Sequence, residues 1–183
     1  MSAESEWLAA LARSSREMDE QAARQMEGLT AEQMNWRPDP ETWSVLQQFH
    51  HVVLANRPYI GIMERLAGMA GPHQSCYRPG FWGKLMLKMV GPDETISVSV
   101  PKPLVPSELP MTLDVVAEYR AIQDRYHGVM KVLDGKDLNG KLTSPFAKFV
   151  RLKLGDALHM MERHNARHLG KAISLMERPD FPR

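Results

Sequence analysis

Apolar residues recur at intervals of three and four positions along four long stretches of the chain, a spacing that places them on one face of an α-helix. The stretches cover residues 4–29, 44–69, 112–133 and, starting at either 146 or 154, a last one that ends at 176. The third stretch has the clearest pattern, with apolar or aromatic residues at Val115, Val116, Tyr119, Ile122, Tyr126, Val129, Met130 and Leu133. The pattern predicts four amphipathic helices.

Residues with specific backbone preferences predict where these helices begin and where they are disturbed. Ser44, followed by Gln47 three positions later, matches a capping box at the start of the second helix. Thr112 can cap the third helix in the same way. Pro58 predicts a kink or a local break inside the second helix, because its ring clashes with the carbonyl four residues earlier.

A proline- and glycine-rich segment, residues 70–111, separates the second helix from the third. Its density of helix-breaking residues forbids long regular elements, although residues 81–90 can form one short helix. Residues 140–145 are predicted to form a turn before the last helix. The expected fold is therefore all-α: a four-helix bundle in one domain spanning residues 1–183, with a long crossover between helices 2 and 3.

Composition and charge narrow the functional classes. The chain has 23 basic and 22 acidic residues, a net charge of +1, and no long Lys/Arg run, so nucleic acid is not an expected partner. It lacks a Gly-x-Ser-x-Gly motif and a glycine-rich phosphate loop. No run approaches the roughly 18 apolar residues of a membrane span, so a membrane partner is not expected. One cysteine, Cys76, and an acidic amphipathic N-terminal stretch favour the reducing cytoplasm.

Three of the seven histidines lie in the last predicted helix. His164 and His168 are four residues apart, so their side chains lie on one helical face with Cβ atoms about 5–6 Å apart. The same face is otherwise apolar, with Met160, Met161 and Ala172 at helical spacing. Burying these imidazoles without partners costs on the order of 1–3 kcal/mol each, which a metal ion or a polar network must offset. The pair is a candidate metal site that needs a third ligand.

The pattern alone leaves that third ligand open. His50 and His51 are adjacent in the second helix and diverge by about 100°, so only one of them can face the site. His159 lies five residues before His164, rotated away from the pair, and is expected to contact solvent or a salt-bridge partner. His127 can supply a hydrogen bond or a proton to the pocket, or lie on the surface.

Two sequence blocks carry a resemblance to a known family. The first is Asn35–Ser44, with the letters NWRPDPETWS, leading into a helix that contains His51. The second is His164–Leu169, with the letters HNARHL. With these blocks the chain resembles the DinB-like (damage-inducible) superfamily of metal-binding four-helix bundles, which includes bacterial thiol transferases that act with bacillithiol or mycothiol.

The resemblance implies a complete ligand set. The family's first metal histidine comes eight residues after the tryptophan of its Trp-Ser pair, a position that His51 holds relative to Trp43. His51, His164 and His168 are thus the expected ligands of a nickel or zinc ion. Hydrogen-bond partners for the outer imidazole nitrogens are expected among Asn56, Glu162, Asp124 and backbone carbonyls.

Three neutral imidazoles leave a coordination position open for a water or a thiol, as in catalytic zinc sites. The leading expectation is a metal-dependent enzyme, a thiol-dependent transferase or a hydrolase, whose small-molecule substrates include a low-molecular-weight thiol. The alternative is a non-catalytic, metal-stabilised binding or dimerisation module of the stress response. Because bundles with exposed apolar edges often pair, a homodimer is expected in either case.

Overall fold

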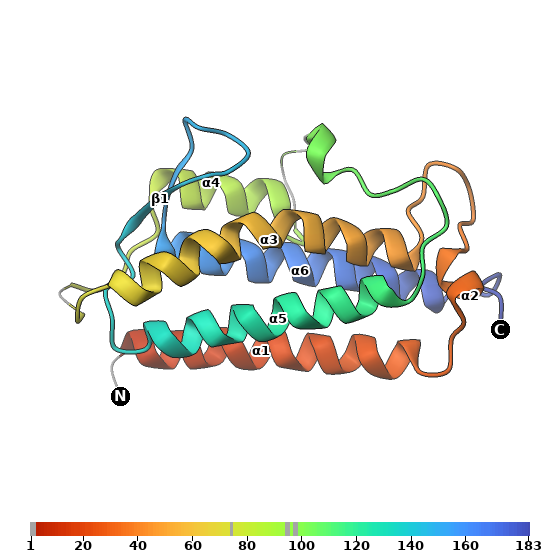
Figure 1. Ribbon diagram of the computed structural model, residues 1–183, viewed down its shortest axis with the longest axis horizontal. Coiled ribbons are helices and arrows are strands. Elements are labelled where there is room, and N and C mark those ends of the chain that lie inside the picture. The colour runs from red at the N-terminus through yellow and green to blue at the C-terminus, as the bar shows by residue number, and fades with distance from the viewer. Residues whose placement is uncertain (1–2, 74, 94–95, 97–98) are drawn as a thin grey trace.

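The computed structural model describes residues 3–73, 75–93, 96 and 99–183, so positions 74, 94–95 and 97–98 of the predicted crossover lie outside the described residues. Its four long helices run side by side, as Figure 1 shows. They are α1 (Ala3–Met26), α3 (Val45–Met69), α5 (Asp114–Leu133) and α6 (Leu154–Met176). The predicted all-α fold of four long helices is confirmed. That residues 1–183 form one domain stays a prediction.

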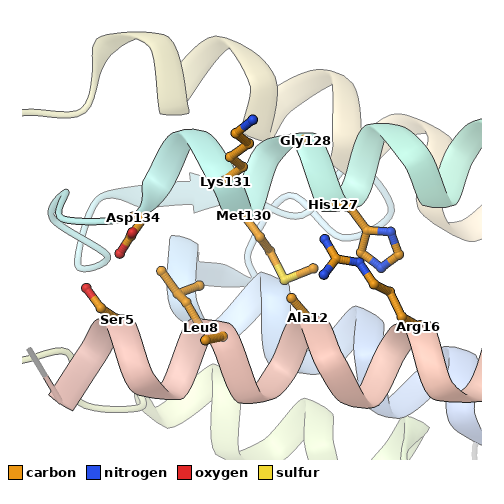
Figure 2. A pocket seen from close by; sticks show the side chains of 10 residues that line it. Ser5, Leu8, Ala12, Arg16, His127, Gly128, Met130, Lys131 and Asp134 are labelled. Atoms are coloured by element: carbon orange, nitrogen blue, oxygen red, sulfur yellow. The ribbon is translucent and has the colours of Figure 1, made fainter. Parts of the chain in front are cut away.

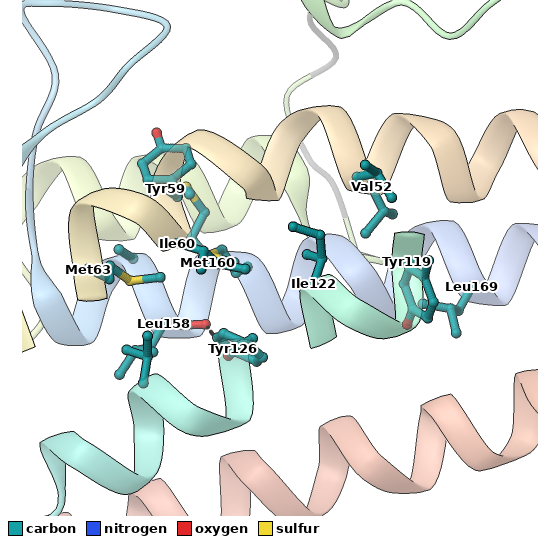
Figure 3. Packing of buried hydrophobic residues seen from close by; sticks show 14 of the residues in the cluster. Val52, Tyr59, Ile60, Met63, Tyr119, Ile122, Tyr126, Leu158, Met160 and Leu169 are labelled. Carbon is teal, nitrogen blue, oxygen red and sulfur yellow. Dashed lines mark hydrogen bonds between the residues drawn. The ribbon is translucent and has the colours of Figure 1, made fainter. Parts of the chain in front are cut away.

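Helix α3 lies at the centre of the packing, against α5 on one side and α6 on the other, while α1 covers α6 and α5. Figure 3 shows side chains of α3, α5 and α6 meeting in the shared core. Tyr126 is fully buried, and its hydroxyl donates a hydrogen bond to the carbonyl of Leu158 at 2.8 Å. Each such buried side chain contributes about 1.5–3 kcal/mol through removal of apolar surface from water.

The start of α3 follows the predicted capping box. The Ser44 hydroxyl accepts from the Gln47 amide at 3.2 Å, and the Gln47 side chain accepts from the Ser44 amide at 3.0 Å. Of the predicted kink or local break at Pro58, the break is wrong, because α3 continues through the proline to Met69, and the kink stays a prediction. Buried residues such as Asn56 and Tyr59 hold the helix on both sides of the proline.

The connections contain short helices. The predicted helix in the crossover is confirmed as α4 (Phe81–Val90), and a 3₁₀ helix, η1 (Lys102–Leu104), follows it. The first connector contains a helix that the sequence pattern did not predict, α2 (Ala31–Asn35), with a capping box of its own. The predicted cap of α5 at Thr112 is only partly right. Leu113 holds the N-cap position and its side chain makes no capping hydrogen bond, whereas the Thr112 hydroxyl accepts from the Asp114 amide at 3.4 Å and donates to the Asp114 carboxylate at 2.8 Å.

A small antiparallel hairpin stands where a turn was predicted. Its strands are β1 (Lys141–Thr143) and β2 (Arg151–Lys153), with Leu142 opposite Leu152. Strands of three residues are too short to show a clear alternation of apolar and polar positions. The hairpin fixes the start of α6 at Leu154, one of the two starts predicted. Among the described helices, none combines the length and the apolarity of a membrane span.

Candidate metal centre

Three imidazoles converge between α3 and α6. His51 comes from α3, and His164 and His168 come from successive turns of α6. One ring nitrogen from each residue lies within 4.8 Å of the other two. The ring centroids are 5.0 Å apart for His51 and His164, 4.4 Å for His51 and His168, and 4.5 Å for His164 and His168. The structure therefore brings together the three residues that the sequence selected.

The helical register explains why His51, and not its neighbour, faces the cluster. His51 is buried, whereas His50 is half-buried and turned toward the crossover. The Nδ1 atom of His50 accepts a hydrogen bond from the Ser107 amide at 3.2 Å. The choice that the sequence pattern left open thus falls on His51, as the family resemblance implies.

Acceptor groups outside the cluster orient two of the three rings. The Nδ1 atom of His51 lies 2.7 Å from the carbonyl oxygen of Leu104, and Nδ1 of His168 lies 2.7 Å from the side-chain oxygen of Gln48. Because these oxygens only accept, Nδ1 carries the proton in both rings. The lone pair then lies on Nε2, the nitrogen that is turned toward the cluster. Acceptors of this kind fix the tautomer of metal-binding histidines.

The distance between the ring nitrogens suits a shared ion. The Nε2 atoms of His51 and His164 are 3.1 Å apart. Nitrogen ligands at about 2.0–2.1 Å from a tetrahedral ion lie about 3.3 Å from one another. Without an ion, the same separation is a hydrogen bond in which Nε2–H of His164 donates to Nε2 of His51. The donor set of three imidazoles fits a divalent transition metal.

Trp43 forms one wall of the centre. Its ring centroid is 5.0 Å from that of His51 and 6.1 Å from that of His168, where the planes are inclined by only 24°. The residue precedes the Ser44 cap, so the same capping box that starts α3 also places the indole over the imidazoles. An aromatic wall lowers the local polarity and restricts the access of water to the cluster.

The three histidines are held neutral, which is the form that binds metals. Burial lowers the pKa of His51 and of His168, and lowers that of His164 to about 3. The positive charges of Arg167 and Lys171 lower the same pKa values further. The centre is therefore a cluster of neutral imidazoles in the positive potential of Arg167 and Lys171.

The remaining histidines lie elsewhere. His159 is half-buried and packs edge-on against Trp7, with centroids 6.1 Å apart; of the two expected surroundings, solvent and a salt-bridge partner, its partial exposure agrees with the first. His127 hydrogen-bonds the Ser15 hydroxyl at 3.1 Å and lines a separate cavity of about 310 Å³ between α1 and α5, where Arg16 lies beside it (Figure 2). Neither residue belongs to the three-histidine cluster.

The expected hydrogen-bond partners were only partly right. A backbone carbonyl, that of Leu104, holds His51, but Asn56 donates to Asn165 at 2.8 Å and Glu162 accepts from Ser14 at 2.8 Å. Among the described residues, Asp124 forms no hydrogen bond with the cluster. Gln48 was missed, although its position three residues before His51 places both on one face of α3.

Comparison with known protein families agrees with this centre. The family model described as the DinB superfamily matches residues 6–172, which include both sequence blocks and all three histidines. The chain belongs to the DinB superfamily. The comparisons with curated proteins and with solved structures each gave no match. DinB membership therefore confirms the resemblance, and the geometry adds a buried three-histidine cluster that can hold a metal.

Proposed function

We propose that the protein is a metal-dependent enzyme, a thiol-dependent transferase or a hydrolase, with a divalent metal on His51, His164 and His168. The observation that carries the proposal is the orientation of the cluster: Leu104 and Gln48 bind the outer nitrogens, which leaves inner nitrogens for an ion. Three protein ligands leave room for a further one, the arrangement of catalytic zinc sites. Nickel and zinc are the proposed metals, since both accept imidazole ligands.

The protein's own groups favour an anionic ligand at this centre. The positive charges of Arg167 and Lys171 act on all three histidines. Both residues follow the pair on α6, so the charge is built into the helix that supplies two ligands. A divalent metal bound there lowers the pKa of a water or thiol that joins it. The surrounding cations stabilise the resulting anion in the same way.

In the proposed transfer, a small thiol gives its proton to the solvent and its sulfur forms a bond to an electrophilic carbon. The bond from that carbon to the leaving group breaks, and the leaving group departs with the electron pair. In the hydrolase version, water replaces the thiol. Trp43 restricts solvent on one side of the cluster, which favours the bound nucleophile over bulk water. The proposed substrates are a low-molecular-weight thiol and a small electrophile.

Metal analysis of the purified protein beside single alanine variants tests the proposal. The His51→Ala, His164→Ala and His168→Ala variants are expected to lose the metal and the activity in a screen of several small thiols and of hydrolysable esters. His50→Ala and His159→Ala are matched controls, because each lies in the same helix as a ligand but outside the cluster. Both controls should keep the metal and the activity.

The same variants distinguish an enzyme from a non-catalytic, metal-stabilised binding or dimerisation module. For an enzyme, His164→Ala abolishes turnover and changes the melting temperature little. For a module, no substrate is turned over and the same substitution mainly lowers the melting temperature. A full metal content in all three ligand variants would refute the metal centre itself.

A further inference from the structure

Basic residues gather on one side of the bundle, although the net charge of the whole chain is only +1. Residues 78–91 and 140–153 contain seven Lys and Arg side chains and no acidic residue, so the rest of the chain carries 16 basic against 22 acidic residues. The seven are Arg78, Lys84, Lys88, Lys141, Lys148, Arg151 and Lys153. In the described part of the chain none of them forms an ion pair. Asp93, the next acidic residue, pairs with Arg163.

The two basic segments are neighbours in space. Helix α4 and strand β2 are in contact, and both pack on α6. The Lys153 ammonium donates to the carbonyl of Arg78 at 2.8 Å, which joins the base of the hairpin to the segment before α4. Figure 1 shows α4 and the hairpin on the same side of the bundle, away from α1 and α5.

Exposed aromatic side chains lie among these cations. Phe81 is 74% exposed and Phe149 is 71% exposed. Trp82 lies between them, with ring centroids 5.3 Å from Phe81 and 5.7 Å from Phe149. A cluster of two exposed phenylalanines and a tryptophan is costly in water, which indicates a surface that is covered in the working protein. We call these three residues and the seven cations the basic aromatic face.

Helix α4 itself has the composition of an interfacial helix. Most of its ten residues are apolar, yet only Gly83 is buried. The exposed Phe81, Lys84 and Lys88 follow one helical stripe, and half-buried residues such as Leu85 and Met89 flank it. Lysines beside aromatic and aliphatic side chains on one short surface helix are typical of segments that insert between lipid headgroups.

We propose that the basic aromatic face attaches the protein peripherally to an anionic membrane surface. The six exposed cations, which are all but Lys153, would contact the lipid phosphates, and the rings would enter the headgroup region. Charge argues against a second copy here, since a two-fold contact would place the seven cations opposite themselves. The aliphatic Leu85 and Met89 argue for lipid over nucleic acid, because they cannot stack on bases. The expectation of no membrane partner rested on the lack of a spanning segment, which peripheral attachment does not need.

Sedimentation of the full chain with lipid vesicles tests the proposal. We expect binding to vesicles of phosphatidylcholine with phosphatidylglycerol at low salt, and little binding to phosphatidylcholine alone or at high salt. Lys84→Gln and Lys148→Gln should each weaken the partition coefficient about fivefold. The Phe81→Ser/Phe149→Ser variant should weaken it at least as much. Leu109→Ser is the matched control, since Leu109 is 76% exposed but lies outside the face.

Equal melting temperatures of the variants and the parent would show that folding is intact. Several results would overturn the proposal: no binding to anionic vesicles at low salt, equal binding by the parent and the patch variants, or loss of binding in Leu109→Ser. If the variants of the basic aromatic face differ from the parent in molecular mass by sedimentation equilibrium, the face would instead be a contact with a second copy of the chain. Salt-sensitive binding of single-stranded RNA without vesicle binding would assign it to nucleic acid.

Discussion

The side-chain oxygen of Gln48 lies 2.7 Å from Nδ1 of His168, inside the bundle and 120 positions away along the chain. The contact links α3 to α6 beside the histidine cluster, and it fixes which nitrogen of His168 carries the proton. Gln48, which lies on α3 with His51, thus orients His168 on α6. The pair makes the metal affinity depend on the packing of the two helices.

Replacing Gln48 with leucine removes this acceptor while it keeps most of the buried volume. We expect the affinity for zinc or nickel to fall about 10–100-fold, the usual effect of losing a partner of a metal-binding histidine. Competition with a chromophoric chelator measures the change. Gln48→Glu retains an acceptor and should keep the affinity. Unchanged affinity in the leucine variant would show that the hydrogen bond does not orient His168.

The lowered histidine pKa values predict that the metal-free protein is sensitive to acid. Histidines of the unfolded chain bind protons below about pH 6.5, whereas those of the cluster stay neutral to lower pH, to about 3 for His164. The unfolded state then binds more protons, so the free energy of unfolding falls as the pH drops through this window. Each imidazole contributes at most about 1.4 kcal/mol per pH unit.

Urea unfolding in the presence of a chelator measures this loss. The measurements run from about pH 7 to about pH 5, because the histidines of the unfolded chain take up their protons in this range. His164→Ala removes one of the groups and should show a shallower dependence on pH than the parent protein. His73→Ala serves for comparison, since His73 is exposed in the crossover and lies outside the cluster. If His164→Ala lost as much stability in acid as the parent protein, His164 would not be one of the histidines with a lowered pKa.

Asn165, between the two ligands of α6, belongs to a different network. Its side chain accepts from Asn56 at 2.8 Å and donates to Gln123 at 3.0 Å, and Gln123 in turn donates to Asp19 of α1. Asn165→Ala leaves two buried amides unsatisfied and should lower the free energy of unfolding by about 2–3 kcal/mol. Metal content should stay constant. If Asn165→Ala lost the metal and kept its stability, Asn165 would instead belong to the histidine cluster.

At Gly83, helix α4 packs directly against Asp156 of α6. A methyl group added at this glycine would lie 2.3 Å from the Asp156 carboxyl carbon, and Asp156 is buried while it accepts from the Gly80 amide. Gly83→Ala should therefore destabilise the protein by about 1–3 kcal/mol. At Gly61 of α3, an added methyl group would have no atom within 4 Å, so Gly61→Ala should stabilise the protein by about 0.5–1 kcal/mol. Thermal unfolding compares the two, and equal shifts would contradict the close packing.

The long helices were predictable because each buries a wide apolar stripe, and the repeat survives over five or more turns. The three-residue strands and α2 were not, since such short elements carry no periodic signal. Thr112 shows a further limit. Its hydroxyl does accept from the first amide of the helix, that of Asp114, at 3.4 Å, but Leu113 holds the N-cap position, so the helix begins one residue later than predicted.

For the site, the spacing of His164 and His168 predicted the pair, and the family resemblance chose His51 over His50. Geometry alone supplied Gln48 and the particular carbonyl, that of Leu104, since both contacts join residues far apart in the sequence. That these histidines bind nickel or zinc, and that the protein acts on a thiol and forms a homodimer, stays a prediction.

The Leu104 carbonyl belongs to η1, a single turn near the end of the crossover, and it is the acceptor that holds His51. A displacement of that turn by a ligand or a neighbouring surface would release the Nδ1 proton of His51 from its acceptor. The ring would then be free to rotate or to exchange tautomers, and its hold on an ion would weaken. The crossover is thus linked by one hydrogen bond to the first of the three histidines, so a contact on the outside of the bundle would change how firmly the cluster can hold an ion.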